Sequence, residues 1–102
     1  MNVEARIIRR VSVRGIVQGV GYRAFAERHA LRHGLEGWVR NRKDGSVEAV
    51  FAGTAAAVEA MIAECRIGPR HGRVDALDQR DGTEDELKLR APGDVFSVLP
   101  TV

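Results

Sequence analysis

The order of apolar and polar positions in the first third of the chain predicts a strand followed by a helix. Residues 6–14 place Val11 and Val13 between polar neighbours, and this period of two is typical of a strand with one buried face. Residues 22–33 follow helical spacing, with apolar, aromatic and histidine side chains on one broad face. Gly34 is suited to end this helix, because glycine readily adopts the left-handed conformation of a helix cap.

The middle of the chain predicts a hairpin and a second helix. Residues 35–42 form one expected strand, and residues 46–51, in which positions alternate, form its return strand. Residues 43–45, Lys-Asp-Gly, give the turn, since Asp-Gly tolerates the positive φ angles that it needs. A helix follows Thr54, a suitable N-cap, and ends at residues 68–69, Gly-Pro. Its core stripe consists of Val58, Met61, Ile62 and Cys65.

The last third completes a fold class. Residues 72–79 and 95–99 predict two more strands, and the acidic residues 81–94 between them predict a loop or a partly ordered segment. The order β-α-β-β-α-β plus a short C-terminal strand is that of an α+β, ferredoxin-like sandwich. Two helices then cover one face of an antiparallel sheet, because both crossovers are expected to be right-handed. We expect residues 1–102 to form a single domain.

Composition narrows the class of protein further. The chain has a mass of 11.2 kDa, and its 44% hydrophobic and 29% charged residues are ordinary for a globular domain. No stretch approaches the roughly 20 apolar residues that cross a membrane, and the N-terminus lacks the pattern of a signal peptide. The single Cys65 excludes an intramolecular disulfide, and one Cys with three His makes a dedicated zinc site unexpected. We therefore expect a small cytoplasmic domain without a metal.

Charge is distributed unevenly along the chain. Residues 1–50 hold ten basic and five acidic residues, a net charge of +5, whereas residues 51–102 hold six and nine, a net charge of −3. The basic excess favours an anionic ligand in the first half, although scattered surface arginines would give the same count. Nucleic acid is a weaker candidate, because the five aromatic residues do not follow the pattern of an RNA-binding sheet.

A glycine-rich loop is the sharpest local feature. Residues 15–23 read Gly-Ile-Val-Gln-Gly-Val-Gly-Tyr-Arg, and such a loop before a helix can turn several backbone N–H groups towards one anion. Arg23 would lie in the first turn of the helix, where a cation is unfavourable unless an anion meets it. No Lys-Ser or Lys-Thr completes a P-loop, and Ala24 breaks the dinucleotide fingerprint. A tight turn with an exposed arginine remains the alternative.

Asn41 is the second candidate for chemistry. It stands at the end of an expected strand, where asparagine is often only a turn former. Its amide could instead hold a water or a substrate oxygen, because it offers both donors and an acceptor without a charge. Arg40 and Arg42 flank it and either add positive potential or are solvated, whereas Trp38 is expected to pack in the core.

The histidines and the cysteine are rival catalysts. His29 and His33 lie four residues apart, a spacing that metals accept, yet no third ligand is evident and we expect packing or surface roles. His71 falls in a turn and should be exposed. Cys65 lies on an apolar helix stripe, which favours a core position over a nucleophile.

Two separated motifs resemble those of the acylphosphatases. Residues 13–23 are similar to the V-Q-G-V-x-[FY]-R loop of that family, and residues 34–41, Gly-Leu-Glu-Gly-Trp-Val-Arg-Asn, resemble its second signature. Residues 44–48 and 68–74 resemble its hairpin and post-helix segments. The chain departs from the family at His33, where an apolar residue is common, and at its C-terminus, which lacks the aromatic residue of many members. The second departure puts the pairing of the last strand in doubt.

The resemblance implies hydrolysis of small acyl phosphates to a carboxylate and inorganic phosphate. It implies that Arg23 and Asn41 are catalytic, with Arg23 holding the phosphoryl group and Asn41 orienting water. The implied phosphate-binding loop residues are Gly15, Gln18, Gly19, Val20 and Gly21. A metal or cofactor is not implied, because a carboxylate leaves readily and preorganised donors can stabilise the charge of a loose phosphoryl transition state. The expected protein is a monomer that binds neither nucleic acid nor membrane.

Two other functions compete with this interpretation. A non-catalytic anion-binding module is one, since acylphosphatase-like domains also occur inside larger maturation proteins that use carbamoyl phosphate. The end of the chain soon after the domain disfavours it. RNA binding through the sheet is the other, and the scarcity of aromatic residues disfavours that function.

Overall fold

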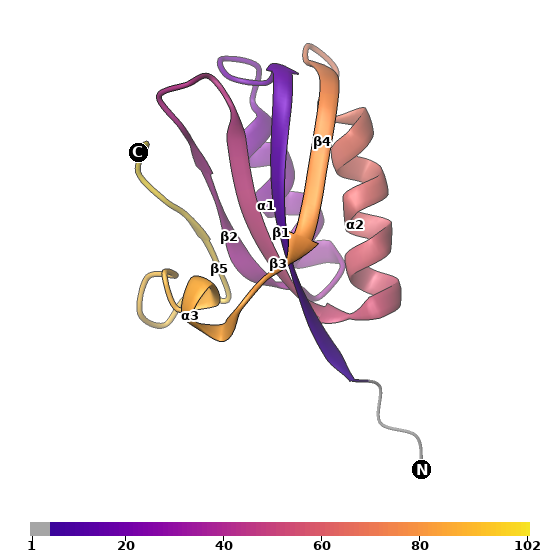
Figure 1. Cartoon of the computed structure of the whole chain (residues 1–102), viewed down its shortest axis with the longest axis vertical. Coiled ribbons are helices and arrows are strands. Elements are labelled where there is room, and N and C mark those ends of the chain that lie inside the picture. Colours follow the sequence, from indigo (N-terminus) through magenta and orange to yellow (C-terminus); the bar gives the residue numbers. More distant parts are fainter. Residues whose placement is uncertain (1–4) are drawn as a thin grey trace.

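The computed structural model describes residues 5–102. Residues 1–4, which belong to the expected domain, lie outside the described residues. The elements follow the chain (Figure 1) as β1 (Arg6–Ile16), α1 (Tyr22–Arg32), β2 (Glu36–Asn41), β3 (Val47–Thr54), α2 (Ala55–Ile67), β4 (Arg73–Asp81), α3 (Glu84–Leu87) and β5 (Phe96–Val98). This order confirms the expected ferredoxin-like α+β fold. No helix within residues 5–102 is long and apolar enough to cross a membrane.

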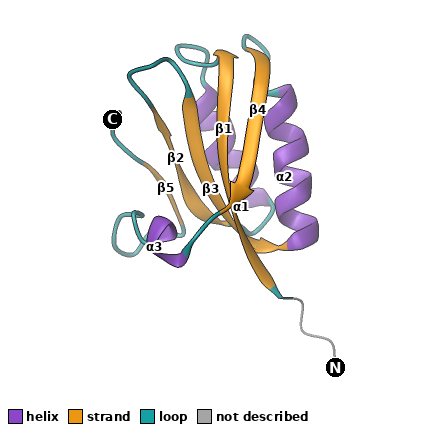
Figure 2. Ribbon diagram, in the orientation of Figure 1, coloured by secondary structure: helices purple, strands orange, loops and turns teal. Residues whose placement is uncertain are grey.

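The sheet is mixed, so the expectation of an antiparallel sheet is wrong at one edge. Its strands lie in the order β4-β1-β3-β2-β5, and every pairing is antiparallel except that of β2 with β5. The parallel pairing arises because β4 ends at the end of the sheet where β2 begins. The α3 segment crosses the sheet there, and β5 then runs beside β2 in the same direction (Figure 2).

The terminal strand is paired despite the missing aromatic residue. Residues 37–39 of β2 pair with residues 96–98 of β5, and Phe96 is buried. Beyond β5, the Leu99 N–H donates to the Val39 carbonyl at 2.9 Å and the Val102 N–H donates to the Asn41 carbonyl at 3.2 Å. The C-terminal segment therefore extends along β2 as far as its last residue.

The main core lies between one face of the sheet and helices α1 and α2. Thr54 caps α2, because its Oγ1 accepts a hydrogen bond from the Ala57 N–H at 3.2 Å. The stripe predicted for this helix is buried, and Gly34 after α1 has the expected positive φ of 70°. The buried side chains that α1 contributes are Tyr22, Phe25, Ala26 and Ala30.

A second, smaller core covers the opposite face of the sheet. Residues 81–94, expected as a loop or a partly ordered segment, contain the short helix α3, which begins with a capping box of Thr83 and Glu86. Leu87 of α3 is 2% exposed, and the Trp38 indole N–H donates to the Glu86 carbonyl at 2.7 Å. Trp38 is a core residue, as predicted, in a cluster of Trp38, Val50, Ala52 and Leu87. Both faces of β3 are consequently buried.

Candidate functional site

The loop between β1 and α1 presents the start of a helix without a side-chain cap. Gly19 and Gly21 have φ angles of 75° and 82°, which only glycine adopts readily, and a Cβ at either position would meet no atom within 4 Å. Gly21 is the N-cap of α1, and the first turn contains no acidic residue. The N–H groups and the positive end of the helix dipole are therefore left to interact with a ligand.

A cavity of about 380 Å³ opens beside this loop. Its walls come from the loop, the first two turns of α1, the end of β2 and β5. The lining residues are Val17, Gln18, Gly19, Gly21, Tyr22, Arg23, Ala24, Glu27, Asn41 and Val98. Of the seven residues expected at the site, the five that line this cavity are Gln18, Gly19, Gly21, Arg23 and Asn41.

Gly15 and Val20 do not line the cavity. Gly15 belongs to β1 rather than to the loop, and it pairs with Val74 at a register shift in the β1–β4 ladder. Its φ is 133°, and a Cβ would lie 2.2 Å from the Arg73 carbonyl oxygen, so the close approach of β4 requires glycine there. Val20 is half-buried against the main core. The loop is thus shorter than the glycine pattern predicts.

The Gln18 side chain ties the loop to the β2–β3 hairpin. Its amide nitrogen donates to the carbonyl oxygens of Arg42 and Ser46, both at 2.8 Å. An amide nitrogen carries two N–H donors, and these contacts use both of them. Gln18 therefore sets the distance between the loop and the strand end that carries Asn41.

Arg23 also lines the cavity. The side chain is half-buried, and no carboxylate among residues 5–102 forms an ion pair with it. Glu27, one helical turn further along α1, lines the same cavity without taking part in an ion pair within the described chain. The planar N–H donors of Arg23 match the oxygens of a phosphate group.

Asn41 is the last residue of β2 and lines the same cavity as the loop. Its Oδ1 is buried, and within residues 5–102 this is the one buried side-chain oxygen or nitrogen without a hydrogen-bond partner. A buried acceptor without a partner costs about 1–3 kcal/mol, so such atoms concentrate where a ligand or a water completes them. Asn41 thus lines the cavity and carries an acceptor for which the described part of the chain supplies no donor.

The rival catalysts lie elsewhere. His29 and His33 of α1 both contact the Glu64 carboxylate of α2, the latter at 2.9 Å, and the hydrogen bond from His29 contributes most to lowering the Glu64 pKa. Residues 5–102 contain no cluster of ligands that could hold a metal ion. Burial raises the pKa of the Cys65 thiol to about 12, which makes it a poor nucleophile. His71 is exposed, as predicted.

The spacing of His29 and His33 indicated that they share a helix face, but it did not predict that both contact the Glu64 carboxylate. Glu64 lies 35 and 31 residues further along the chain, and nothing in the local pattern marks it. The sequence did not predict that Glu27 and Val98 line the cavity either. Their positions there depend on how α1 and β5 pack beside β2.

Fold and cavity together define a ferredoxin-like domain with a glycine loop, an arginine and an asparagine around one pocket. The acylphosphatase family model matches residues 9–91. An acylphosphatase of Rhodopseudomonas palustris strain BisB18 is 60% identical over 96 residues, which cover 94% of this chain and 97% of that protein. The chain belongs to the acylphosphatase family.

Solved structures agree with this assignment. The crystal structure of acylphosphatase from Bacillus subtilis is 30% identical, with a TM-score of 0.79 over 91% of this chain and 98% of that one. A full-length HypF in the phosphate- and nucleotide-bound form matches 98% of this chain with 13% of its own, at a TM-score of 0.82. Its identity of 24% shows the fold alone.

Proposed function

We propose that this chain hydrolyses the carboxyl-phosphate bond of small acyl phosphates, releasing a carboxylate and inorganic phosphate. The observation that carries the proposal is that Asn41, whose buried Oδ1 has no hydrogen-bond partner among the described residues, lines the same cavity as the glycine loop and Arg23. Family membership supports the reaction class, and the cavity supports the assignment of roles to residues.

The phosphoryl group binds at the loop. The backbone N–H groups between Gly19 and Gly21 and at the start of α1 donate to its oxygens, and Arg23 adds a charged, two-pronged contact. These donors stand in place before the reaction, so they stabilise the charge that spreads over the phosphoryl oxygens in the transition state. Gln18 contributes by holding the loop, because its amide donors are already used.

Asn41 orients the attacking water. Its Oδ1 accepts a hydrogen bond from the water and directs the water oxygen towards phosphorus, a proximity effect rather than base catalysis. The new phosphorus–oxygen bond forms as the bond from phosphorus to the carboxylate oxygen breaks. The carboxylate departs with the bonding electron pair, one proton of the water stays on the phosphate, and the other passes to solvent. A neutral amide is sufficient because the carboxylate is a good leaving group.

The size and the donors of the cavity bear on the substrate and on the need for a cofactor. A cavity of about 380 Å³ suits a small acyl phosphate, and the donors already present allow turnover without a metal or other cofactor. Residues 1–102 act as a single, monomeric, cytoplasmic domain, with no nucleic-acid or membrane partner. Arginines on β1 and β4 are paired with carboxylates of β4 and α3, so their charges are already balanced within the protein. This pairing argues against a nucleic acid as the partner of that surface.

The two catalytic assignments separate by kinetics. With benzoyl phosphate as substrate and a chelator present, Arg23→Ala should raise the inhibition constant of phosphate by about 10–100-fold, the value of a charged hydrogen-bond pair. Asn41→Ala should lower kcat by about 100-fold with a much smaller change in phosphate inhibition. Wild-type protein that binds phosphate without turnover would instead favour a regulatory anion-binding module, and a requirement for a divalent metal would also refute the proposal.

A further inference from the structure

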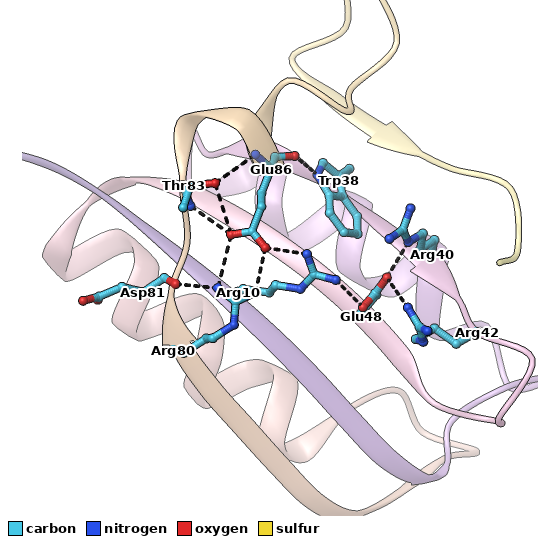
Figure 3. A network of polar contacts seen from close by, with 9 residues as sticks. All are labelled: Arg10, Trp38, Arg40, Arg42, Glu48, Arg80, Asp81, Thr83 and Glu86. Carbon is cyan, nitrogen blue, oxygen red and sulfur yellow. Dashed lines mark hydrogen bonds and ion pairs between the residues drawn. The ribbon is translucent and has the colours of Figure 1, made fainter.

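The end of β2 is held from the face of the sheet opposite the cavity. Side chains alternate along a strand, so Asn41 faces the cavity while Arg40 and Arg42 lie on the other face. There both arginines donate to one oxygen of Glu48, from Arg40 Nε at 2.5 Å and from Arg42 Nη1 at 3.1 Å (Figure 3). One carboxylate therefore fixes both chain neighbours of Asn41.

Glu48 is suited to this role because it is buried and remains charged. It lies directly opposite Arg40 in the β2–β3 register and is 5% exposed. Its second oxygen accepts from Arg10 Nη2 at 2.8 Å. Burial alone would raise the pKa of Glu48, but the hydrogen bonds from Arg40 and Arg10 outweigh it and lower that pKa. A buried ion that three arginines surround has few alternative positions.

The same clamp reaches the phosphate loop. Arg42 contacts Glu48 through its side chain, while its carbonyl oxygen accepts one of the two hydrogen bonds from Gln18. A continuous series of contacts thus runs from Glu48 through Arg42 to Gln18 and the loop. Arg40 is restrained further, since its guanidinium lies 4.6 Å from the centre of the Trp38 ring.

We propose that Glu48 is a positioning residue for hydrolysis, which holds Asn41 at the correct distance from the loop-bound phosphoryl group. It contacts no substrate and acts through Arg40 and Arg42. This inference rests on the proposed function, because it assumes that Asn41 orients the attacking water. Displacement of a reacting group by about 1 Å can cost about 100-fold in rate, so loss of the clamp is expected to reduce kcat more than binding.

Glu86 offers a matched control within the same network. Its carboxylate accepts from Arg10 at 2.5 Å and from Arg80 at 2.7 Å, as Figure 3 shows. Among the described residues it forms no hydrogen bond or ion pair with Arg40 or Arg42. Glu86→Gln therefore perturbs the network and leaves the neighbours of Asn41 in place.

The test compares Glu48→Gln with Glu86→Gln on benzoyl phosphate. Glu48→Gln should lower kcat by about tenfold, while the inhibition constant of phosphate stays within about twofold because both hydrogen bonds from Gln18 to the hairpin carbonyls remain. Glu86→Gln should keep both quantities within about twofold of wild type. Equal losses of kcat in the two variants, or a kcat of Glu48→Gln within twofold of wild type, would overturn the inference.

A double-mutant cycle separates positioning from a general loss of structure. In an Asn41→Ala background, Glu48→Gln should lower kcat by less than about twofold, because the group that it positions is gone. An undiminished tenfold loss in that background would overturn this inference and leave the proposed function intact. If Asn41→Ala itself retained wild-type kcat, the proposed function would fail first.

A second variant covers the case in which Glu48→Gln does not fold. The Arg42 side chain is 41% exposed, and its removal leaves Glu48 paired with Arg10 and Arg40, so Arg42→Gln should fold. It should show the same pattern of lowered kcat with nearly unchanged phosphate inhibition. A wild-type kcat in this variant would contradict the proposed path through Arg42.

Discussion

Replacement of Gln18 by methionine tests how the phosphate loop is held. Methionine has a similar length and no donors, so Gln18→Met removes the two hydrogen bonds to the carbonyls of Arg42 and Ser46 with little change in packing. The loop then loses its tie to the hairpin. We expect the variant to be less stable even without phosphate, and to bind phosphate more weakly.

The expected loss of stability depends on the hydrogen bonds that the carbonyls of Arg42 and Ser46 keep in the variant. The Arg42 carbonyl still accepts from the Gly45 N–H at 3.1 Å, and the Ser46 carbonyl still accepts from the Arg42 N–H at 2.9 Å. No acceptor is left unpaired, so each lost bond costs its net value of about 0.5–1.5 kcal/mol. A total near 2 kcal/mol lowers Tm by roughly 8–16 °C for a domain of this size.

Thermal unfolding with and without phosphate, together with phosphate inhibition, is the assay. A lower Tm in the absence of phosphate and a raised inhibition constant would support the role of Gln18 as a tie. If Gln18 instead bound phosphate directly, the inhibition constant would rise while the Tm of the phosphate-free protein stayed the same. That second result would refute the reasoning.

Three further substitutions test other parts of the structure. Hydrogen bonds chiefly from Arg80 lower the pKa of Glu86 from 4.5 to about 2, so Glu86→Gln should lose about 1 kcal/mol at neutral pH after solvent screening. The difference in unfolding free energy between wild type and Glu86→Gln should disappear as pH falls from 4.5 towards 2, as measured by urea titration. A difference that does not depend on pH would contradict the role of the charged carboxylate. Gly15→Ala should destabilise the protein by about 2 kcal/mol or more, because its Cβ meets the Arg73 carbonyl at positive φ; unchanged urea unfolding would argue against this. Glu27 lines the cavity, so its carboxylate should repel a substrate that carries a second carboxylate; Glu27→Gln should therefore raise kcat/KM for succinyl phosphate relative to benzoyl phosphate by about fivefold, the equivalent of about 1 kcal/mol, and an unchanged ratio would contradict this repulsion.

Local patterns in the sequence predicted most of the fold. The stripe of α2 and the cap at Thr54 depend on spacings within one helix, and both are confirmed. Residues 81–94, which contain α3, were expected to form a loop or a partly ordered segment because they are polar and acidic, and Leu87 is the one buried residue of that helix. Leu87 is buried by Trp38 and Val50 of the sheet, which are distant in the sequence, so the local pattern could not predict its packing.

The candidate site divides in the same way. Arg23 and Asn41 stand at positions that the motifs mark, and the structure places both at one cavity. The contacts of Gln18 connect residues 24 and 28 positions apart, so the motif marked the residue while its partners depended on the fold. Gly15 belongs to the same glycine pattern, yet it lies in β1, pairs with Val74 of β4 and does not line the cavity.

The central claim is that water held by Asn41 attacks the phosphorus of an acyl phosphate bound at the glycine loop. The most direct measurement is hydrolysis of benzoyl phosphate by the wild-type protein in water enriched in a heavy oxygen isotope, with a chelator present. The account predicts turnover with the isotope in the phosphate and not in the benzoate. Absence of turnover, or appearance of the isotope in the benzoate, would contradict it.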